Sequence, residues 1–171
     1  VFSFEGFDAR NEGLGPHDGG MTSTIHCSRI TCQEAWDNPS WPKIEREYAQ
    51  DVQYPDLPAD PNWDQYLALE AAGALRCIGV FDGEKLIVFA NYVFYSLPHF
   101  AGKRLASSES VWVDLDYRGQ GVGHMLIQAL FDYAKEDGVF GMYLGAKIGT
   151  RAAKVFEKIA TPMNVLYWRK L

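Results

Sequence analysis

The sequence predicts a single domain of mixed α and β structure, for three reasons: its length, its composition and the order of its patterns. The chain has 171 residues, of which 47% are hydrophobic and 22% charged, and this is the composition of a globular domain with a core. Strand and helix patterns alternate along the chain. The longest mostly apolar stretch, residues 86–97, is too short for a membrane-spanning helix, so we expect no membrane contact.

Charge and cysteine content narrow the class further. The net charge of −6 opposes a general nucleic-acid binder, because such proteins present a basic surface to phosphate. Cys27, Cys32 and Cys77 are odd in number and form no CxxC pair. We therefore expect reduced core thiols in a reducing compartment and predict a cytoplasmic location.

The first twenty residues differ from the rest. Residues 1–20 are rich in Gly, Asp and Glu and show no sustained period, which predicts a flexible extension or cloning remnant ahead of a domain over residues 21–171. A native ordered arm that packs Phe2, Phe4 and Phe7 is the alternative interpretation.

The next elements are a strand and three helices. Residues 24–30 predict the strand, and Thr31 with Glu34 has the form of a capping box, which predicts a short helix. Ser40 is the expected cap of the second helix. Proline-rich, acidic residues up to 61 predict a loop, after which Asp60 caps a third helix that Gly73 ends.

A hairpin and a central strand follow. Residues 75–81 and 86–97 flank the tight-turn sequence of residues 82–85, a pattern typical of a β-hairpin. The second of these strands is apolar on both alternating faces, so we expect it at the centre of the sheet with helices covering both sides. The remaining elements are expected to be a basic loop over 98–106, strands over 108–115, 140–146 and 164–170, and helices over 121–137 and 150–159.

The stretch over residues 111–123 carries the clearest chemistry: a strand, a turn with Gly119, Gly121 and Gly123, and then an amphipathic helix. Glycines let backbone amides approach a ligand, and a helix N-terminus adds free N–H groups and a positive dipole end. This combination predicts a phosphate or pyrophosphate ligand. A Walker loop is excluded because His124 follows where Lys is required, and a Rossmann turn because the glycines come after a hairpin.

These residues resemble a known family. Residues 118–123 fit the [QR]-x-x-G-x-[GA] signature of the GNAT acyltransferases, and 113–118 are similar to the V-x-P-x-Y-R sequence before it, with Leu115 in place of proline. The element order is also similar. The resemblance implies a mixed, mostly antiparallel, V-shaped sheet with helices on both faces. The segments around Pro98 and the C-terminus resemble GNAT proteins encoded in phage genomes, which implies the host cytoplasm.

The resemblance implies acetyl-CoA as co-substrate, no metal, and an N-acetyltransferase acting on a primary amine of a small molecule or protein, by direct attack in a ternary complex. The resemblance leaves open whether the protein forms a homodimer. Val111 and Val113 would pair with the pantetheine arm. The residues whose backbone amides would hold the pyrophosphate are Arg118, Gly119, Gln120, Gly121, Val122 and Gly123.

Three residues are candidates for proton transfer. Glu109 is the expected base; it shares strand parity with Val111 and Val113, so we expect its side chain on their face. A solvated or ion-paired glutamate is the alternative. The family's usual tyrosine and asparagine in the last helix are replaced by Phe156 and Gly149. Tyr143 and Tyr167 are therefore the candidate acids.

Phe156 and Gly149, which replace the family's usual tyrosine and asparagine, favour a rival function: a non-catalytic acyl-CoA-binding or virion-associated interaction module. Acidic residues at 51, 56, 60 and 64 lie where this family lines its acceptor side, and they would attract a cationic amine. A solvated loop is the alternative interpretation. Nearby Trp36, Trp41 and Trp63 are expected to form a hydrophobic floor under the helices.

Overall fold

A computed structural model describes residues 24–54 and 56–170. The expected extension over residues 1–20 lies outside this described part. The described chain forms a five-stranded sheet in the order β1-β2-β3-β4-β5, with β5 parallel to β4 and the other neighbours antiparallel. The strands are β1 (Ile25–Ile30), β2 (Leu75–Asp82), β3 (Lys85–Tyr95), β4 (Leu105–Val113) and β5 (Gly141–Tyr143).

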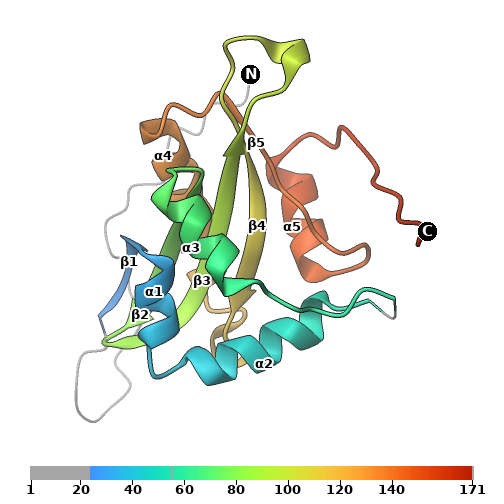
Figure 1. Cartoon of the computed structure of the whole chain (residues 1–171). Coiled ribbons are helices and arrows are strands. Elements are labelled where there is room, and N and C mark those ends of the chain that lie inside the picture. The colour runs from blue at the N-terminus through green and yellow to red at the C-terminus, as the bar shows by residue number, and fades with distance from the viewer. Residues whose placement is uncertain (1–23, 55, 171) are drawn as a thin grey trace.

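Helices cover both faces of this sheet (Figure 1). The helices are α1 (Cys32–Asp37), α2 (Trp41–Val52), α3 (Trp63–Ala71), α4 (Val122–Glu136) and α5 (Arg151–Ile159), with short 3-10 turns at Pro98–Phe100 and Leu115–Tyr117. The first three helices lie on one face and α4 on the other. None of the described helices combines the length and hydropathy that crossing a bilayer requires.

The sheet separates two hydrophobic clusters, as the two-sided apolar pattern of β3 predicts. Ile87 and Ala106 belong to the cluster under α4, together with Leu126 of that helix. Phe89 and Trp112 belong to the cluster under α1, α2 and α3. The prediction of a mixed, mostly antiparallel sheet with helices on both faces is confirmed.

Local sequence signals set most element ends. The capping box of Thr31 and Glu34 forms in full, and Gly138 follows the last turn of α4, as predicted. Two predicted caps differ from the structure. Ser40 is the N-cap residue of α2, as predicted, but its side chain makes no capping hydrogen bond, because its own backbone is already helical. Asn62, not Asp60, caps α3, because its side-chain oxygen accepts from the backbone N–H of Gln65.

The later strands differ most from expectation. β4 begins at Leu105, inside the predicted basic loop, and β5 ends at Tyr143, well before residue 146. The predicted closing strand over 164–170 is wrong, since those residues take no helix or strand conformation. A strand needs a neighbouring edge, and the short β5 offers only three residues.

Candidate functional site

The site begins where β4 and β5 part. The two strands pair only from Leu105 with Gly141 to Ser107 with Tyr143, and within residues 24–54 and 56–170 no strand lies beside the rest of β4 on that side. Beyond these pairs, the segment after β5 contacts β4 through the hydrogen bond from the Gly145 N–H to Ser108 Oγ, 3.0 Å. The V shape expected for the sheet is therefore present, and its opening lies beside the second half of β4.

A β-bulge sits at this opening. Against β3, Ser108 pairs with Tyr92 and Ser110 pairs with Asn91, so Glu109 is an extra residue with no partner. A bulge bends its strand and changes which face later side chains occupy. Glu109 therefore does not follow the parity of Val111. The expectation that the two share a face is wrong.

Glu109 instead faces the side of the sheet that α1, α2 and α3 cover. Its Oε1 accepts a 2.6 Å hydrogen bond from the hydroxyl of Tyr66 on α3. Val111 and Val113 pack with the cluster on the α4 side. Burial and the bond to Glu109 raise the pKa of Tyr66 well above its usual value, so this hydroxyl keeps its proton and donates throughout the neutral pH range.

At the other end of β4, the glycine turn presents backbone donors. Four N–H groups, those of Gly119, Gly121, Val122 and Gly123, donate to no described acceptor. Six backbone amides were expected to be available for the pyrophosphate, and two of them already have acceptors within the chain. The Arg118 amide donates to Leu115 O and the Gln120 amide to Tyr117 O.

This turn fits a diphosphate. Gly121 takes φ +89° at the start of α4, a left-handed conformation that side chains disfavour, and a Cβ there would enter space that no described atom occupies. Free amides at the positive end of a 15-residue helix bind anions. A cation stands nearby as well, because the Arg151 guanidinium of α5 would lie 3.7 Å from a Cβ at Gly119.

Ionic contacts hold the turn to α2. Asp114, fully buried at the end of β4, binds Lys43 Nζ at 2.6 Å and Lys85 Nζ at 3.1 Å. Burial alone would raise the pKa of Asp114, but hydrogen bonds from Lys43, the Asp116 amide and Lys85 outweigh it and hold that pKa below its usual value. The Arg118 side chain binds Asp51 of α2 at 2.8 Å, and its Nε donates to Val113 O at 3.0 Å, so it ties the turn to α2 and to the end of β4.

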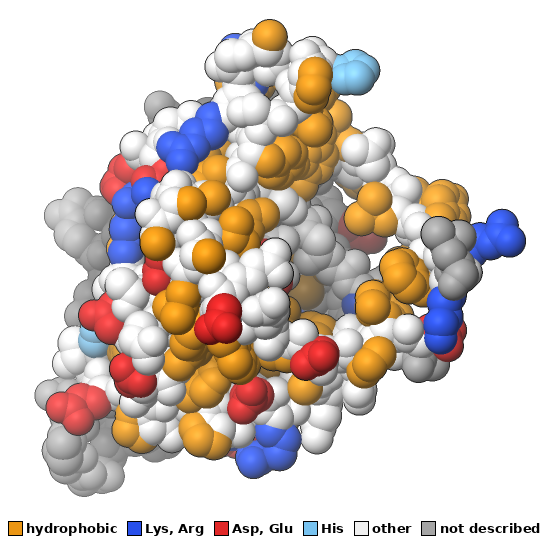
Figure 2. Space-filling view, in the orientation of Figure 1, with side chains coloured by type: hydrophobic (Ala, Val, Ile, Leu, Met, Phe, Trp, Pro, Cys, Tyr) orange, Lys and Arg blue, Asp and Glu red, His pale blue; other side chains and the backbone are white. Residues whose placement is uncertain are grey.

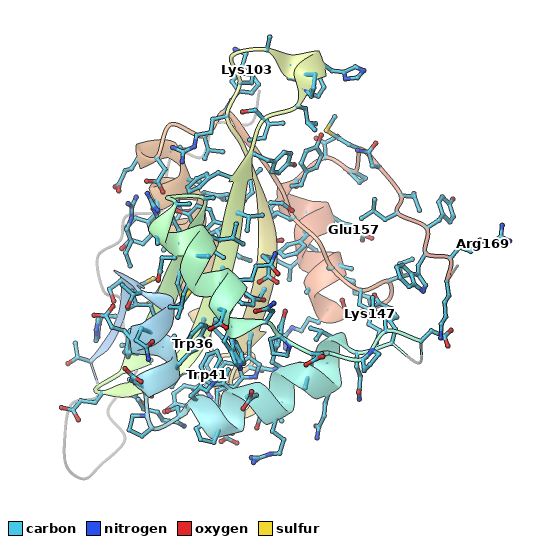
Figure 3. The ribbon with its side chains drawn as sticks, in the orientation of Figure 1. Trp36, Trp41, Lys103, Lys147, Glu157 and Arg169 are labelled. Carbon is cyan, nitrogen blue, oxygen red and sulfur yellow. The ribbon has the colours of Figure 1, made fainter. Side chains whose placement is uncertain are left out.

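A cavity of about 490 Å³ opens beside Glu109, between α2, the segment before α3, and strands β3 and β4. Aromatic side chains make much of its wall: Trp41, Tyr48, Trp63, Tyr66 and Phe89. Trp41 also packs against Trp36 where α1 and α2 meet (Figure 3). The tryptophans therefore form a floor, as predicted, and two of them also line the cavity, which was not expected.

Carboxylates supply the charge of this region. Glu45, Asp60 and Glu109 line the cavity, and no described Lys or Arg does. Acidic side chains lie among hydrophobic ones over α2, α3 and the segment between them (Figure 2). A second cavity of about 270 Å³ adjoins the first and shares Asp60, Tyr66 and Glu109 with it. Of the four predicted acidic residues, only Asp60 reaches either cavity.

Asn91 is a polar residue that the sequence argument passed over. It lies in β3 with 5% of its surface exposed and lines the larger cavity. Its Oδ1 is buried without a hydrogen-bond partner. A buried acceptor left unpaired costs about 1–3 kcal/mol, and of the buried unpaired side-chain atoms in the described chain only those of Asn91 and Ser110 belong to residues that line this cavity. A lone amide in a central apolar strand was the signal available in the sequence.

The candidate acids lie in different settings. Tyr143 ends β5 where the strands part and stacks on Tyr95, with ring centroids 6.4 Å apart. Tyr167 is 91% exposed in the C-terminal segment and lines neither cavity. Phe156 lies half-buried on α5. Gly149 has φ +81°, a conformation that Asn tolerates better than most side chains.

Comparison with solved structures shows the same fold. A ribosomal-protein-alanine N-acetyltransferase from Brucella melitensis biovar Abortus 2308 superposes with a TM-score of 0.66 at 19% identity, over 86% of this chain and 98% of that one. An aminoglycoside acetyltransferase, meta-AAC0020, from an uncultured soil metagenomic sample, solved with sisomicin, gives 0.65 at 18% identity, over 86% and 96%.

A third structure, AAC(6')-Iy in complex with the bisubstrate analogue CoA-S-monomethyl-acetylneamine, gives a TM-score of 0.64 at 16% identity, over 87% of this chain and 99% of that one. No curated protein matches the sequence. The model of the acetyltransferase (GNAT) family matches residues 34–160, which include β2 to β5, the glycine turn and Glu109. Since this match spans well over half of the chain, the protein belongs to the GNAT family of acetyltransferases.

Proposed function

We propose that the protein transfers an acetyl group from acetyl-CoA to a primary amine, by direct attack within a ternary complex. One observation carries the proposal: the bulge at Glu109 adjoins both the open edge of β4 and an acidic cavity. The glycine turn follows the same strand. A donor held along β4 and an amine in the cavity would therefore meet at Glu109.

The donor side is made mostly of backbone. The four free amides between Gly119 and Gly123 would bind the diphosphate of acetyl-CoA, with Arg151 beside them. The open edge of β4 at Val111 would pair with the amides of the pantetheine arm, which adds to the sheet as a strand does. At Val113 the carbonyl already accepts from Arg118 Nε at 3.0 Å, so the arm would have to pair there through the Val113 N–H or displace that bond. This arrangement would direct the thioester along β4 toward the bulge.

The acceptor must lose a proton before it attacks. For an alkylamine with a pKa of about 10.4, deprotonation at pH 7 costs roughly 4–5 kcal/mol. Glu109 would take this proton, directly or through an ordered water, and the Tyr66 hydroxyl holds the carboxylate in place. The amine nitrogen then forms a bond to the acetyl carbon and the carbon–sulfur bond breaks. The nitrogen releases its second proton to solvent as the amide forms, and CoA leaves as thiolate.

The departing thiolate has no acid at the usual position, because Phe156 carries no hydroxyl. Tyr143 is the better placed of the two candidate tyrosines, since it lies at the point where β5 leaves β4. The thiolate also leaves without much help, because a thiol pKa of about 8.5 makes it a fair leaving group. General acid catalysis would add about 10²–10⁴-fold.

Thiol release from acetyl-CoA, measured with and without a panel of amines, tests the proposal. We expect amine-dependent release and an acetylated product by mass spectrometry. The alternative is a non-catalytic acyl-CoA-binding module, which Phe156 and Gly149 favour. Calorimetric binding of CoA without release for any amine or protein acceptor would support that alternative. A homodimer stays a prediction, to be tested by sedimentation.

A further inference from the structure

Three side chains that line the larger cavity present oxygen acceptors without a protein donor. The carboxylates of Glu45 and Asp60 are exposed and make no hydrogen bond or ion pair within the described chain. Asn91 Oδ1 is buried and unpaired. A ligand that satisfies this set needs several N–H donors and positive charge, which are the properties of an ammonium group.

The rest of the wall favours a hydrocarbon stem. Trp41, Trp63 and Phe89 offer ring surfaces, and Val52 and Ala59 add aliphatic surface. Ring faces attract a cation within about 6 Å and also pack well against methylene groups. No described Lys or Arg lines either cavity to compete with a cationic ligand.

We propose that the acceptor is a linear diamine or polyamine, whose reacting nitrogen lies at Glu109 while its second ammonium binds Asp60 and Glu45. This inference rests on the proposed acetyl transfer and names its substrate class. The methylene stem lies along the aromatic wall, and Asn91 Oδ1 accepts from an N–H of the ligand. Because Asp60 borders both cavities, a longer polyamine extends into the smaller one.

The test uses three acceptors of nearly equal length that differ only at the far end: pentylamine, cadaverine and δ-aminovalerate. They place a methyl, an ammonium and a carboxylate, respectively, at the second site. We expect kcat/KM for cadaverine to exceed that for pentylamine by about tenfold, the sum of a cation–π contact and a partly exposed ion pair. The aminocarboxylate should be the poorest of the three, and added salt should narrow the differences.

Variants locate the second site. Asp60→Asn and Glu45→Gln should each lower the ratio of kcat/KM for cadaverine to that for pentylamine by about threefold or more, the effect of one lost ion pair and its contacts. Asp56→Asn is the matched control, because Asp56 belongs to the same acidic segment and is exposed but lines neither cavity. That variant should leave the ratio unchanged.

Calorimetric binding of each amine to the protein–CoA complex separates the two proposals. Preferential binding of cadaverine that Asp60→Asn removes would support the diamine site even where no acetyl transfer is seen, and the proposed function alone would then fail. Equal kcat/KM and equal affinity for pentylamine and cadaverine would overturn the diamine inference while leaving acetyl transfer intact. A ratio that falls as much in Asp56→Asn as in Asp60→Asn would also overturn it.

Discussion

The bulge at Glu109 and the glycine turn after Val113 lie at the two ends of the second half of β4, and they are built in different ways. After Val113, the glycine turn offers backbone amides and is clamped to α2 through Asp114 and Arg118. Around the bulge at Glu109, the cavity is built from side chains of α2, α3, β3 and β4 and the segment before α3. One end is backbone held by ion pairs, and the other is a side-chain surface open to solvent.

The difference suggests that the two proposed substrates are recognised by different parts of the chain: the donor by backbone amides and the acceptor by side chains. A diphosphate is the same in every acyl-CoA, and free amides at a helix start recognise it without any particular side chain. An acceptor is recognised by the size, charge and aromatic surface of its cavity, which change with every substitution. We therefore expect changes at the turn to reduce donor binding and changes at the bulge to reduce turnover or acceptor choice.

The largest expected effect is at the turn. Gly121→Val places a branched side chain at φ +89° and fills the space in front of the free amides. Loss of one or two hydrogen bonds to a charged group, at about 1.5–3 kcal/mol each, should weaken CoA binding by roughly 10²–10³-fold, measured by calorimetry.

Gly102→Val is the matched control for that change. Gly102 has φ +73° and open space around its Cβ position, but it lies in the loop between β3 and β4. Both variants should lose about 1–2 kcal/mol of unfolding free energy from strain, and only Gly121→Val should lose CoA affinity. Equal CoA affinity in the two variants would refute the assignment of the turn.

The next effect is at the bulge. Glu109→Gln keeps the shape and a partner for Tyr66 but removes the proposed base, so turnover at pH 7 should fall by about 10²-fold. The loss should shrink toward pH 9 as free amine accumulates, and CoA affinity should stay as in the wild type. Equal rates for both proteins between about pH 6 and 9 would remove Glu109 from the mechanism.

A smaller effect, on stability, tests the clamp. Asp114→Asn leaves Lys43 and Lys85 without their buried counter-charge, and because those side chains are 30% and 42% exposed we expect a loss of about 1–3 kcal/mol of unfolding free energy. The folded pKa of Asp114 is depressed, so its stabilisation is present above the unfolded value of about 3.9 and disappears as the pH falls through the folded pKa.

Urea unfolding at neutral and acid pH measures this prediction. The wild type and Asp114→Asn should differ at pH 7 and converge as the pH falls through the lowered pKa of Asp114. A difference that is the same at both pH values would show that the ionised carboxylate of Asp114 does not stabilise the fold.

The smallest expected effect concerns the hydroxyl beside Glu109. Tyr66→Phe removes the 2.6 Å hydrogen bond to the carboxylate but keeps the ring in the wall. One lost orienting bond, at about 0.5–1.5 kcal/mol, should lower kcat by roughly two- to tenfold with CoA affinity unchanged. A change in CoA affinity with constant kcat would place Tyr66 on the donor side instead.

The same contrast explains what the sequence predicts well. The glycine turn is contiguous, so its residues identify it, and the order of elements around it follows from local patterns and caps. The larger cavity joins residues from 41 to 110 that share no short-range pattern. Tyr66, Asn91 and Arg151 enter the site through tertiary packing, which single-residue patterns do not describe.

The bulge shows a second limit. Strand parity places alternate side chains on one face only while the ladder is regular. One extra residue in β4 turns Glu109 toward α3 and the larger cavity, and no residue type in that stretch marks the change. The C-terminal residues 164–170 read as a strand from their apolar content, yet a strand also needs an edge to pair with, and that edge is not encoded locally.

A crystal structure with acetyl-CoA and cadaverine bound would test the central claim most directly. We predict the diphosphate on the amides of Gly119, Gly121, Val122 and Gly123, the thioester beside the bulge, and the amine nitrogen between the acetyl carbon and Glu109. A thioester that ends away from Glu109, or an amine bound outside the cavity lined by Asp60 and Asn91, would contradict the account.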